Sequence, residues 1–110
     1  MSTIQLHGKS FEIFLPEALI QEKITALATE INTAYAGKKP LFIAVLNGSF
    51  MFASDLFKSI SIEAEICFIK LASYKGTAST GQLITAIGLD IDLTNRHIIV
   101  LEDIIDTGKT

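Results

Sequence analysis

Two stretches of the sequence are apolar without interruption. Residues 41–46 read Leu-Phe-Ile-Ala-Val-Leu and residues 97–101 read His-Ile-Ile-Val-Leu, with no alternation of polar and apolar side chains. A strand with one face in water alternates, whereas a strand covered on both faces does not, and strands of the second kind belong to parallel sheets. The first stretch therefore predicts a central strand covered on both faces, and the second predicts another continuous apolar strand of the same α/β fold.

The segment before the first of these strands has helical periodicity. It begins at Pro16, which suits a first helical turn, and ends near Gly37, which suits a helix stop. Its apolar face is formed by Ile20, Ile24, Leu27, Ala28, Ile31 and Tyr35. The other predicted elements are an N-terminal strand or extended arm at 11–16, a second helix at 50–60, and strands at 64–72 and 82–89. This order favours a Rossmann-like parallel sheet.

Composition and charge narrow the class of protein. A hydrophobic content of 49% with only 19% charged residues predicts a folded core. The net charge of -3 argues against generic nucleic-acid binding. The one cysteine, Cys67, cannot form an internal disulfide and fits a reducing compartment. No apolar run has transmembrane length and no signal-peptide pattern is present, so we expect a cytoplasmic protein without membrane or nucleic-acid partners.

Three predicted strands are followed by segments with unusual chemistry. These segments are Asn47–Ser49, Ser73–Gly81 and Glu102–Thr110. In parallel sheets ligands bind beyond the carboxyl ends of the strands, so the three segments are expected at one edge. The second segment is rich in Gly, Ser and Thr and is expected to be a mobile loop.

Residues 102–110 read Glu-Asp-Ile-Ile-Asp-Thr-Gly-Lys-Thr. A P-loop needs glycine five residues before Gly108, and that position holds Asp103, so the match fails. The backbone N–H groups and the hydroxyls of Thr107 and Thr110 can still hold one phosphate. Carboxylates upstream suit sugar hydroxyls, which describes a site for a ribose 5-phosphate. The alternative is an acidic helix start favoured by the helix dipole.

The acidic residues of this segment also predict a cation. Two like charges about 6 Å apart repel by roughly 3 kcal/mol at an effective dielectric constant of about 20. Several carboxylates facing a polyphosphate would add such terms, and a divalent cation would remove most of the cost. Mg²⁺ suits carboxylate, hydroxyl and phosphate oxygens, and we expect it to bind mainly through the substrate.

The whole string 97–110 resembles a known motif. An apolar strand, two acids, two apolar residues and then Asp-Thr-Gly-x-Thr resemble the phosphoribosyl-diphosphate (PRPP) motif of type I phosphoribosyltransferases. Residues 46–56 resemble the first active-site loop and helix of the hypoxanthine/guanine phosphoribosyltransferases, and residues 73–80 resemble their flexible loop, which begins with Ser-Tyr. The resemblance covers nearly all of the chain from Phe11 onward.

The resemblance implies an activity. The enzyme would be a Mg²⁺-dependent hypoxanthine (and guanine) phosphoribosyltransferase of purine salvage, which takes PRPP and a purine base to the nucleotide and pyrophosphate. Glu102 and Asp103 would bind the ribose hydroxyls with the metal nearby. Asp106 would be the general base or proton carrier beside the purine.

The resemblance implies further binding roles. The 5-phosphate would be held by Asp106, Thr107, Gly108, Lys109 and Thr110. The pyrophosphate would meet Leu46, Asn47 and Gly48, where the family often has a non-proline cis peptide. Ser73 and Tyr74 would belong to the lid that shields the reacting centre from water.

Two positions fit the family pattern less closely. Relatives commonly carry Lys or Arg where this chain has Asn47, and Tyr74 can be an ordinary loop aromatic. The family continues well beyond Thr110, so we expect residues 1–110 to be the N-terminal portion of one truncated domain. That segment alone is expected to be marginally stable and inactive, and the full-length protein a homodimer or homotetramer.

Rival functions stay open at this point. One is a regulator on the same fold that binds nucleotide and RNA. Another is a phosphoribosyltransferase for a different base, because the residues that read the base lie outside this sequence. The last is an α/β fragment without function, which requires the three strand-end segments to be a coincidence.

Overall fold

The computed structural model describes residues 3–75, 82–88 and 91–105. In chain order, the elements in these ranges are β1 (Thr3–Leu6), β2 (Lys9–Glu12), α1 (Glu17–Ala34), β3 (Leu41–Leu46), α2 (Phe50–Lys58), β4 (Glu65–Lys75), β5 (Gln82–Ile87) and β6 (Ile98–Leu101). Among the described residues, neither helix combines the length and hydropathy that a membrane span needs.

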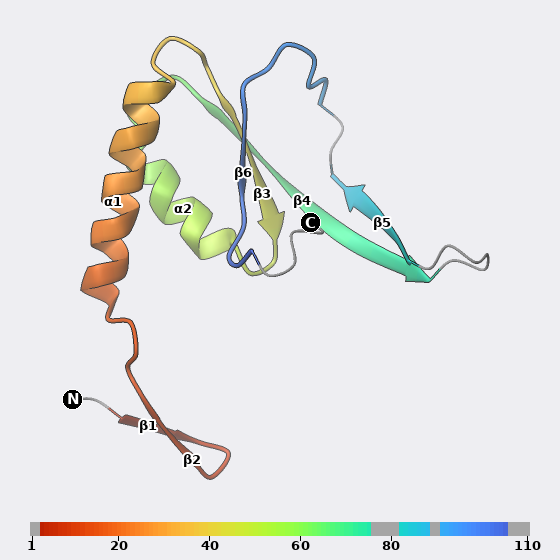
Figure 1. Ribbon diagram of the computed structural model, residues 1–110. Helices are drawn as coiled ribbons and strands as arrows, with labels where there is room; N and C mark the ends of the chain where they lie inside the picture. Colours follow the sequence, from red (N-terminus) through yellow and green to blue (C-terminus); the bar gives the residue numbers. More distant parts are fainter. Residues whose placement is uncertain (1–2, 76–81, 89–90, 106–110) are drawn as a thin grey trace.

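The main sheet has four strands in the order β5-β4-β3-β6 (Figure 1). β3 pairs in parallel with β4 and with β6, while β4 and β5 are antiparallel. Residues 41–44 of β3 are at most 4% exposed, as expected for a strand covered on both faces. The predicted α/β fold with a parallel sheet is therefore confirmed, and β5 adds an antiparallel edge.

The larger core lies where α1 and α2 meet β3 and β6. Its buried residues are Ile24, Ala28, Ile31, Phe42, Ala44, Ala53, Leu56 and Leu101. The rings of Phe42 and Phe57 meet edge to face at 5.5 Å. The predicted apolar face of α1 is correct at its centre, but Ile20 and Leu27 are 42% and 37% exposed and do not belong to the core.

A second cluster covers the other face of β3. Leu41, Ile43 and Ile69 form its buried centre, and Ile91 and Leu93 pack against it from the segment that leads to β6. Because consecutive side chains of a strand point to opposite faces, Phe42 and Ala44 serve the first cluster while Leu41 and Ile43 serve the second. This division explains the uninterrupted apolar sequence of β3.

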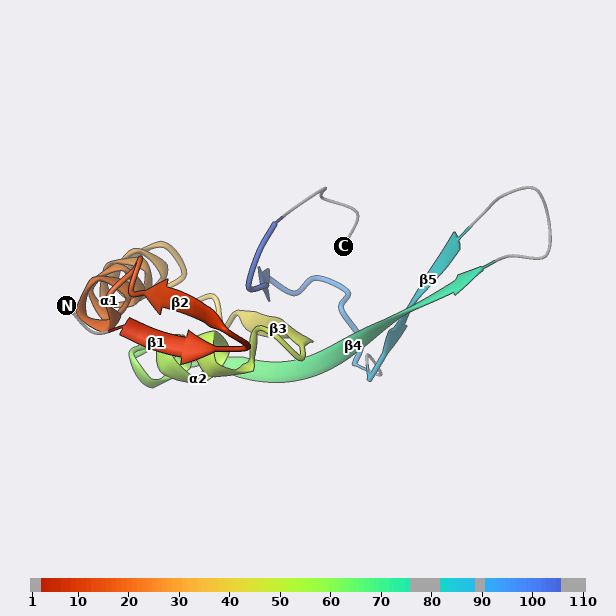
Figure 2. The same ribbon diagram turned by 90° about the horizontal axis from the view of Figure 1, so that it is seen from below.

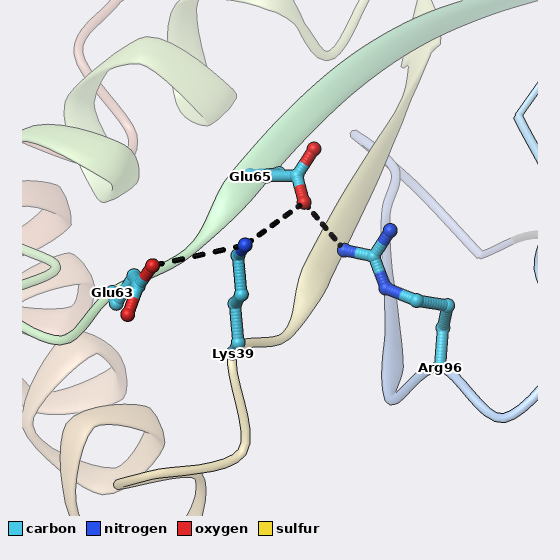
Figure 3. A network of polar contacts seen from close by, with 4 residues as sticks. All are labelled: Lys39, Glu63, Glu65 and Arg96. Atoms are coloured by element: carbon cyan, nitrogen blue, oxygen red, sulfur yellow. Dashed lines mark hydrogen bonds and ion pairs between the residues drawn. The ribbon is translucent and has the colours of Figure 1, made fainter.

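Four charged side chains connect the beginnings of β3, β4 and β6 (Figure 3). Arg96 donates to the Glu65 carboxylate at 2.9 Å, and the Lys39 ammonium lies 3.9 Å from the same oxygen and 3.7 Å from Glu63. Partial exposure of all four limits the energy of each pair. The network nevertheless aligns the strand starts, at the opposite end of the sheet from the predicted site.

The N-terminal residues form a hairpin, which the sequence did not predict. β2 ends at Glu12, and β1 pairs with it across a two-residue turn of His7 and Gly8, whose φ angles are 52° and 73°. Such a turn needs two positive φ values, and the usual Asn-Gly or Asp-Gly signal is missing here. The hairpin residues are exposed, and Figure 1 shows the hairpin projecting away from the helices and the sheet. The radius of gyration of 17.5 Å accordingly exceeds the roughly 13 Å of a compact domain of this length.

Candidate active site

The ends of β3 and β6 bring two of the predicted segments together. The strands are parallel and Ala44 is in register with Leu101. The residues that follow the two strands therefore leave the sheet at the same end, the carboxyl end of the strands, which is called the sheet edge below. Gly48 meets the carboxyl group of Asp103 there: a β-carbon at position 48 would stand 2.8 Å from Cγ of Asp103 and nearer still to Oδ2. Only glycine allows this approach without displacing the carboxylate.

The turn between β3 and α2 is held at several points. The peptide bond between Leu46 and Asn47 is cis, as the family resemblance implies. The carbonyl of Asn47 accepts a hydrogen bond from the N–H of Phe50 at 3.3 Å. The hydroxyl of Ser49, which is fully buried, donates to the carbonyl of Val45. Hydrogen bonds therefore hold the turn that contains residues 46–48 both to the end of β3 and to the start of α2.

The two predicted acids differ in their surroundings. Glu102 is half-buried and borders an apolar groove of about 310 Å³ between α1 and β6. Asp103 is exposed, and its Oδ1 accepts a hydrogen bond from the N–H of Ile104 at 2.9 Å. Both carboxylates remain available to hydroxyl groups or to a cation that approaches the sheet edge.

The described residues contain no group of three or more His, Cys, Asp and Glu side chains arranged around one point. Glu102 and Asp103 offer carboxylate oxygens, which are the ligands that Mg²⁺ prefers. The chemistry of these two side chains therefore suits Mg²⁺, and its binding there stays a prediction.

The predicted lid residues belong to a strand. Leu46, the last residue of β3, is in register with Lys70, and β4 continues for five more residues (Figure 2). Ser73 and Tyr74 lie in this extension and pair with Ile84 and Leu83 of β5. The prediction of a loop beginning at Ser73 is therefore wrong for residues 73–75, because β5 supplies hydrogen-bond partners to a polar sequence. The lid function itself stays a prediction.

The remaining predicted site residues lie outside the described part of the chain. They are Asp106, Thr107, Gly108, Lys109 and Thr110. The described chain leads to them through Ile104 and Ile105, which are 71% and 80% exposed.

Sequence reasoning missed the part that Ser49 plays in the site. Serine before a helix usually indicates a cap that receives the first free N–H groups. Ser49 does occupy the N-cap position of α2, but its side chain makes no capping bond and turns back to β3 instead. The signal that could have indicated this is a serine directly after an Asn-Gly turn at the end of an apolar strand.

Comparison with known proteins supports one family. The family model described as "Phosphoribosyl transferase domain" matches residues 12–110. The chain is 43% identical over 91 residues to a hypoxanthine-guanine-xanthine phosphoribosyltransferase of Tritrichomonas foetus, covering 83% of this chain and 50% of that protein. It is 39% identical over 100 residues to the hypoxanthine-guanine phosphoribosyltransferase of Streptococcus mutans, covering 90% of this chain and 56% of that protein.

Solved structures give the same result. A crystal structure of a hypoxanthine phosphoribosyltransferase from Staphylococcus aureus superposes with a TM-score of 0.77 at 36% identity. The match covers 88% of this chain and 53% of that one. The chain thus spans about half the length of the relatives that it matches.

Proposed function

Because the chain belongs to the phosphoribosyl transferase domain family, we propose that residues 1–110 act as the N-terminal portion of a hypoxanthine (and guanine) phosphoribosyltransferase domain. The full-length enzyme, meaning this segment together with the C-terminal half that its relatives have, would serve purine salvage. It would transfer the 5-phosphoribosyl group of PRPP to the base and release pyrophosphate.

The observation that supports this function most is the meeting of Gly48 with Asp103. It puts the turn after β3, with its backbone polar groups, beside a carboxylate after β6. A substrate that carries a pyrophosphate and vicinal hydroxyls on one sugar needs these two kinds of group side by side. Folds with a parallel sheet also bind their ligands at the loops that follow the carboxyl ends of the strands.

The acids would bind the sugar and the metal. Glu102 and Asp103 would accept hydrogen bonds from the ribose hydroxyls and hold Mg²⁺ largely through substrate and water. The bound cation would supply positive charge that neutralises the departing pyrophosphate. Leu46, Asn47 and Gly48 would meet that pyrophosphate with backbone groups, since Asn47 brings no cation.

The chemical step exchanges one bond for another at C1 of the ribose. The bond to the pyrophosphate oxygen breaks, a bond to the purine nitrogen forms, and the proton displaced from the base passes to Asp106. Thr107, Gly108, Lys109 and Thr110, with Asp106, would hold the 5-phosphate. Ser73 and Tyr74 would exclude water from the reacting centre.

The isolated segment would be inactive. Its surface includes large exposed apolar side chains, among them Val100 at 59% exposed and the half-exposed Phe68. An apolar groove of about 340 Å³ also opens between α1 and α2. We propose that the full-length enzyme covers such surface, forms a homodimer or homotetramer, and works in the cytoplasm.

The test uses the full-length enzyme with PRPP and Mg²⁺ and, in separate reactions, hypoxanthine, guanine and xanthine. Nucleotide formation identifies the base, and Asp106→Asn should lower turnover much more than PRPP affinity. Omitting Mg²⁺ should abolish the reaction. If no base reacts while nucleotide still binds, the proposed enzyme is wrong and a nucleotide-sensing regulator replaces it, with RNA as the next ligand to test.

A further inference from the structure

The side chain of Ser49 makes a hydrogen bond that is neither a helix cap nor a contact with the proposed substrate. Ser49 is 0% exposed, and its Oγ donates to the carbonyl of Val45, four residues earlier. The bond spans the residues from the end of β3 to the start of α2. It encloses Leu46, Asn47 and Gly48, the three residues proposed to meet pyrophosphate.

The bond lies at the point where the sheet stops on one side. β6 ends at Leu101, which is in register with Ala44, so the ladder between β3 and β6 does not reach Val45. The Ser49 hydroxyl supplies a donor to Val45 just beyond this end. A partly buried carbonyl that loses its donor costs free energy, so removal of the hydroxyl should destabilise this position of the turn.

The same turn determines where a carboxylate lies. The backbone of Gly48 is packed against the carboxyl group of Asp103, and any shift of Gly48 must change that contact. The carbonyl of Ser49 also accepts a hydrogen bond from Ala53 at 2.8 Å in the first turn of α2. Ser49 therefore connects three parts of the site edge: the end of β3, the start of α2 and, through Gly48, Asp103.

We infer that Ser49 is a positioning residue of the pyrophosphate-binding turn: its buried hydroxyl, bonded to the Val45 carbonyl, holds Asn47 and Gly48 where their backbone groups meet the pyrophosphate of PRPP. This inference rests on the proposed function. Ser49 does not touch the substrate in this arrangement, because it is fully buried, and acts through the turn alone.

The test is Ser49→Ala in the full-length enzyme. The expected result is a rise of at least about fivefold in the KM for PRPP and in the Kd for magnesium pyrophosphate, with the KM for hypoxanthine within about twofold of wild type. A merely structural defect would reduce the amount of active enzyme, which lowers the maximal rate and leaves both Michaelis constants and the pyrophosphate Kd unchanged. That second pattern would overturn the inference.

Thr29→Val is the matched control. Thr29 makes the same kind of bond, from its hydroxyl to the carbonyl of Thr25 four residues earlier, at 3.0 Å on the exposed side of α1. It belongs to α1 and not to the turn or to the strands that carry the site, so all three constants should stay at their wild-type values. Equal shifts of these constants in both variants would show that the effect does not depend on the turn, and would overturn the inference.

A second variant covers the case in which Ser49→Ala does not fold. Ser49→Cys nearly keeps the volume but has only a weak, longer donor. It should raise the KM for PRPP by a smaller factor than alanine, and an unchanged KM together with an unchanged pyrophosphate Kd would reject the inference. If the wild-type enzyme forms no nucleotide yet binds magnesium pyrophosphate, the proposed reaction fails, and the binding comparison still decides the role of Ser49. If it binds neither, both fail together.

Discussion

The backbone of Gly48 lies so close to the carboxyl group of Asp103 that a β-carbon at position 48 would stand 2.8 Å from the Asp103 Cγ atom. The two residues follow different strands, β3 and β6, and meet because those strands are parallel neighbours. The end of one strand thus limits which side chains the end of the other can carry.

Gly48→Ala is expected to displace the exposed Asp103 carboxylate, because the added methyl group overlaps it, and to lower the free energy of unfolding by at most about 1 kcal/mol, since the carboxylate can rotate into solvent. Urea unfolding measures the effect. The same substitution in an Asp103→Ala background should cost less than about 0.5 kcal/mol, since the overlapping group is gone. An equal cost in both backgrounds would mean that Asp103 does not restrict position 48.

Asn32 connects the two helices and the segment after α2. Its amide nitrogen donates to the carbonyl of Ser59 at 3.1 Å, and its oxygen accepts from the N–H of Ser61 at 2.9 Å. Asn32→Ala should lower the free energy of unfolding by about 1–2 kcal/mol, from two bonds of ordinary strength. Asn32→Asp keeps only the acceptor and should fall between alanine and wild type near neutral pH.

The control for Asn32 is Gln21→Ala. Gln21 makes one exposed bond, to the carboxylate of Asp55 at 3.1 Å, and its loss should change stability by less than about 0.5 kcal/mol. Denaturant titrations of the three variants give the comparison. If Gln21→Ala is as damaging as Asn32→Ala, the two-sided bonding of Asn32 has no special weight.

The ion pairs at the beginnings of β3, β4 and β6 should differ in how much each adds to the free energy of unfolding. Glu65 contacts both Lys39 and Arg96, whereas among the described residues Glu63 has an ion pair with Lys39 only (Figure 3). Glu65→Gln should therefore cost up to about 1 kcal/mol, and Glu63→Gln close to nothing measurable. Raising the salt concentration to about 1 M should bring the two variants closer to wild type, because the pairs are partly exposed. A salt-independent loss in Glu65→Gln would point to packing rather than charge.

The turn before β6 contains a carboxyl group, that of Asp92, whose pKa changes on folding. The N–H of Thr94 donates to the carboxylate of Asp92 at 3.0 Å, and this bond, with a second from the Thr94 hydroxyl, lowers the pKa of Asp92. Because the folded-state pKa lies below the unfolded one, the stabilisation is present above the unfolded pKa and is lost as the pH falls through the folded one.

Asp92→Asn should therefore be less stable than wild type at about pH 6, and the gap should narrow toward about pH 3. Thermal melts at several pH values measure it. Thr94→Ala keeps the backbone bond and should keep most of the pH dependence. A gap that stays constant over this range would show that the carboxylate does not titrate differently on folding.

The sequence predicted secondary structure best where burial of a segment requires a recognisable pattern of apolar residues. Residues 41–46 form β3 as predicted, because a strand between two covered faces cannot include polar residues. The hairpin turn at His7 and Gly8 was missed, because its backbone angles are uncommon for histidine. Ser73 and Tyr74 have loop-like composition but lie in β4, since pairing with a distant strand overrides local preference.

The sequence predicted which strand ends form the site, but not the contacts between their residues. The rule that ligands gather beyond parallel strands indicated that the turn at Asn47 and the acids after β6 lie at one edge. The contact of Gly48 with Asp103 was not predictable, because it depends on the register of Ala44 with Leu101. The direction of the Ser49 hydroxyl was missed for another reason: a serine that follows an Asn-Gly turn before a helix is more often a helix cap than a donor back to the strand.

The length of β4 has a mechanical consequence. Beyond the level of Leu46, β5 is the one described strand that pairs with β4, and the five residues from Leu71 to Lys75 extend about 16 Å past Lys70. In a two-stranded ribbon of this kind, a small rotation at its base moves the far end by a larger distance. A rotation of only about 10° at Lys70 carries its tip through about 3 Å, roughly the length of one hydrogen bond. Small changes of twist at the sheet edge are thus converted into atomic-scale displacements at the far end of the ribbon.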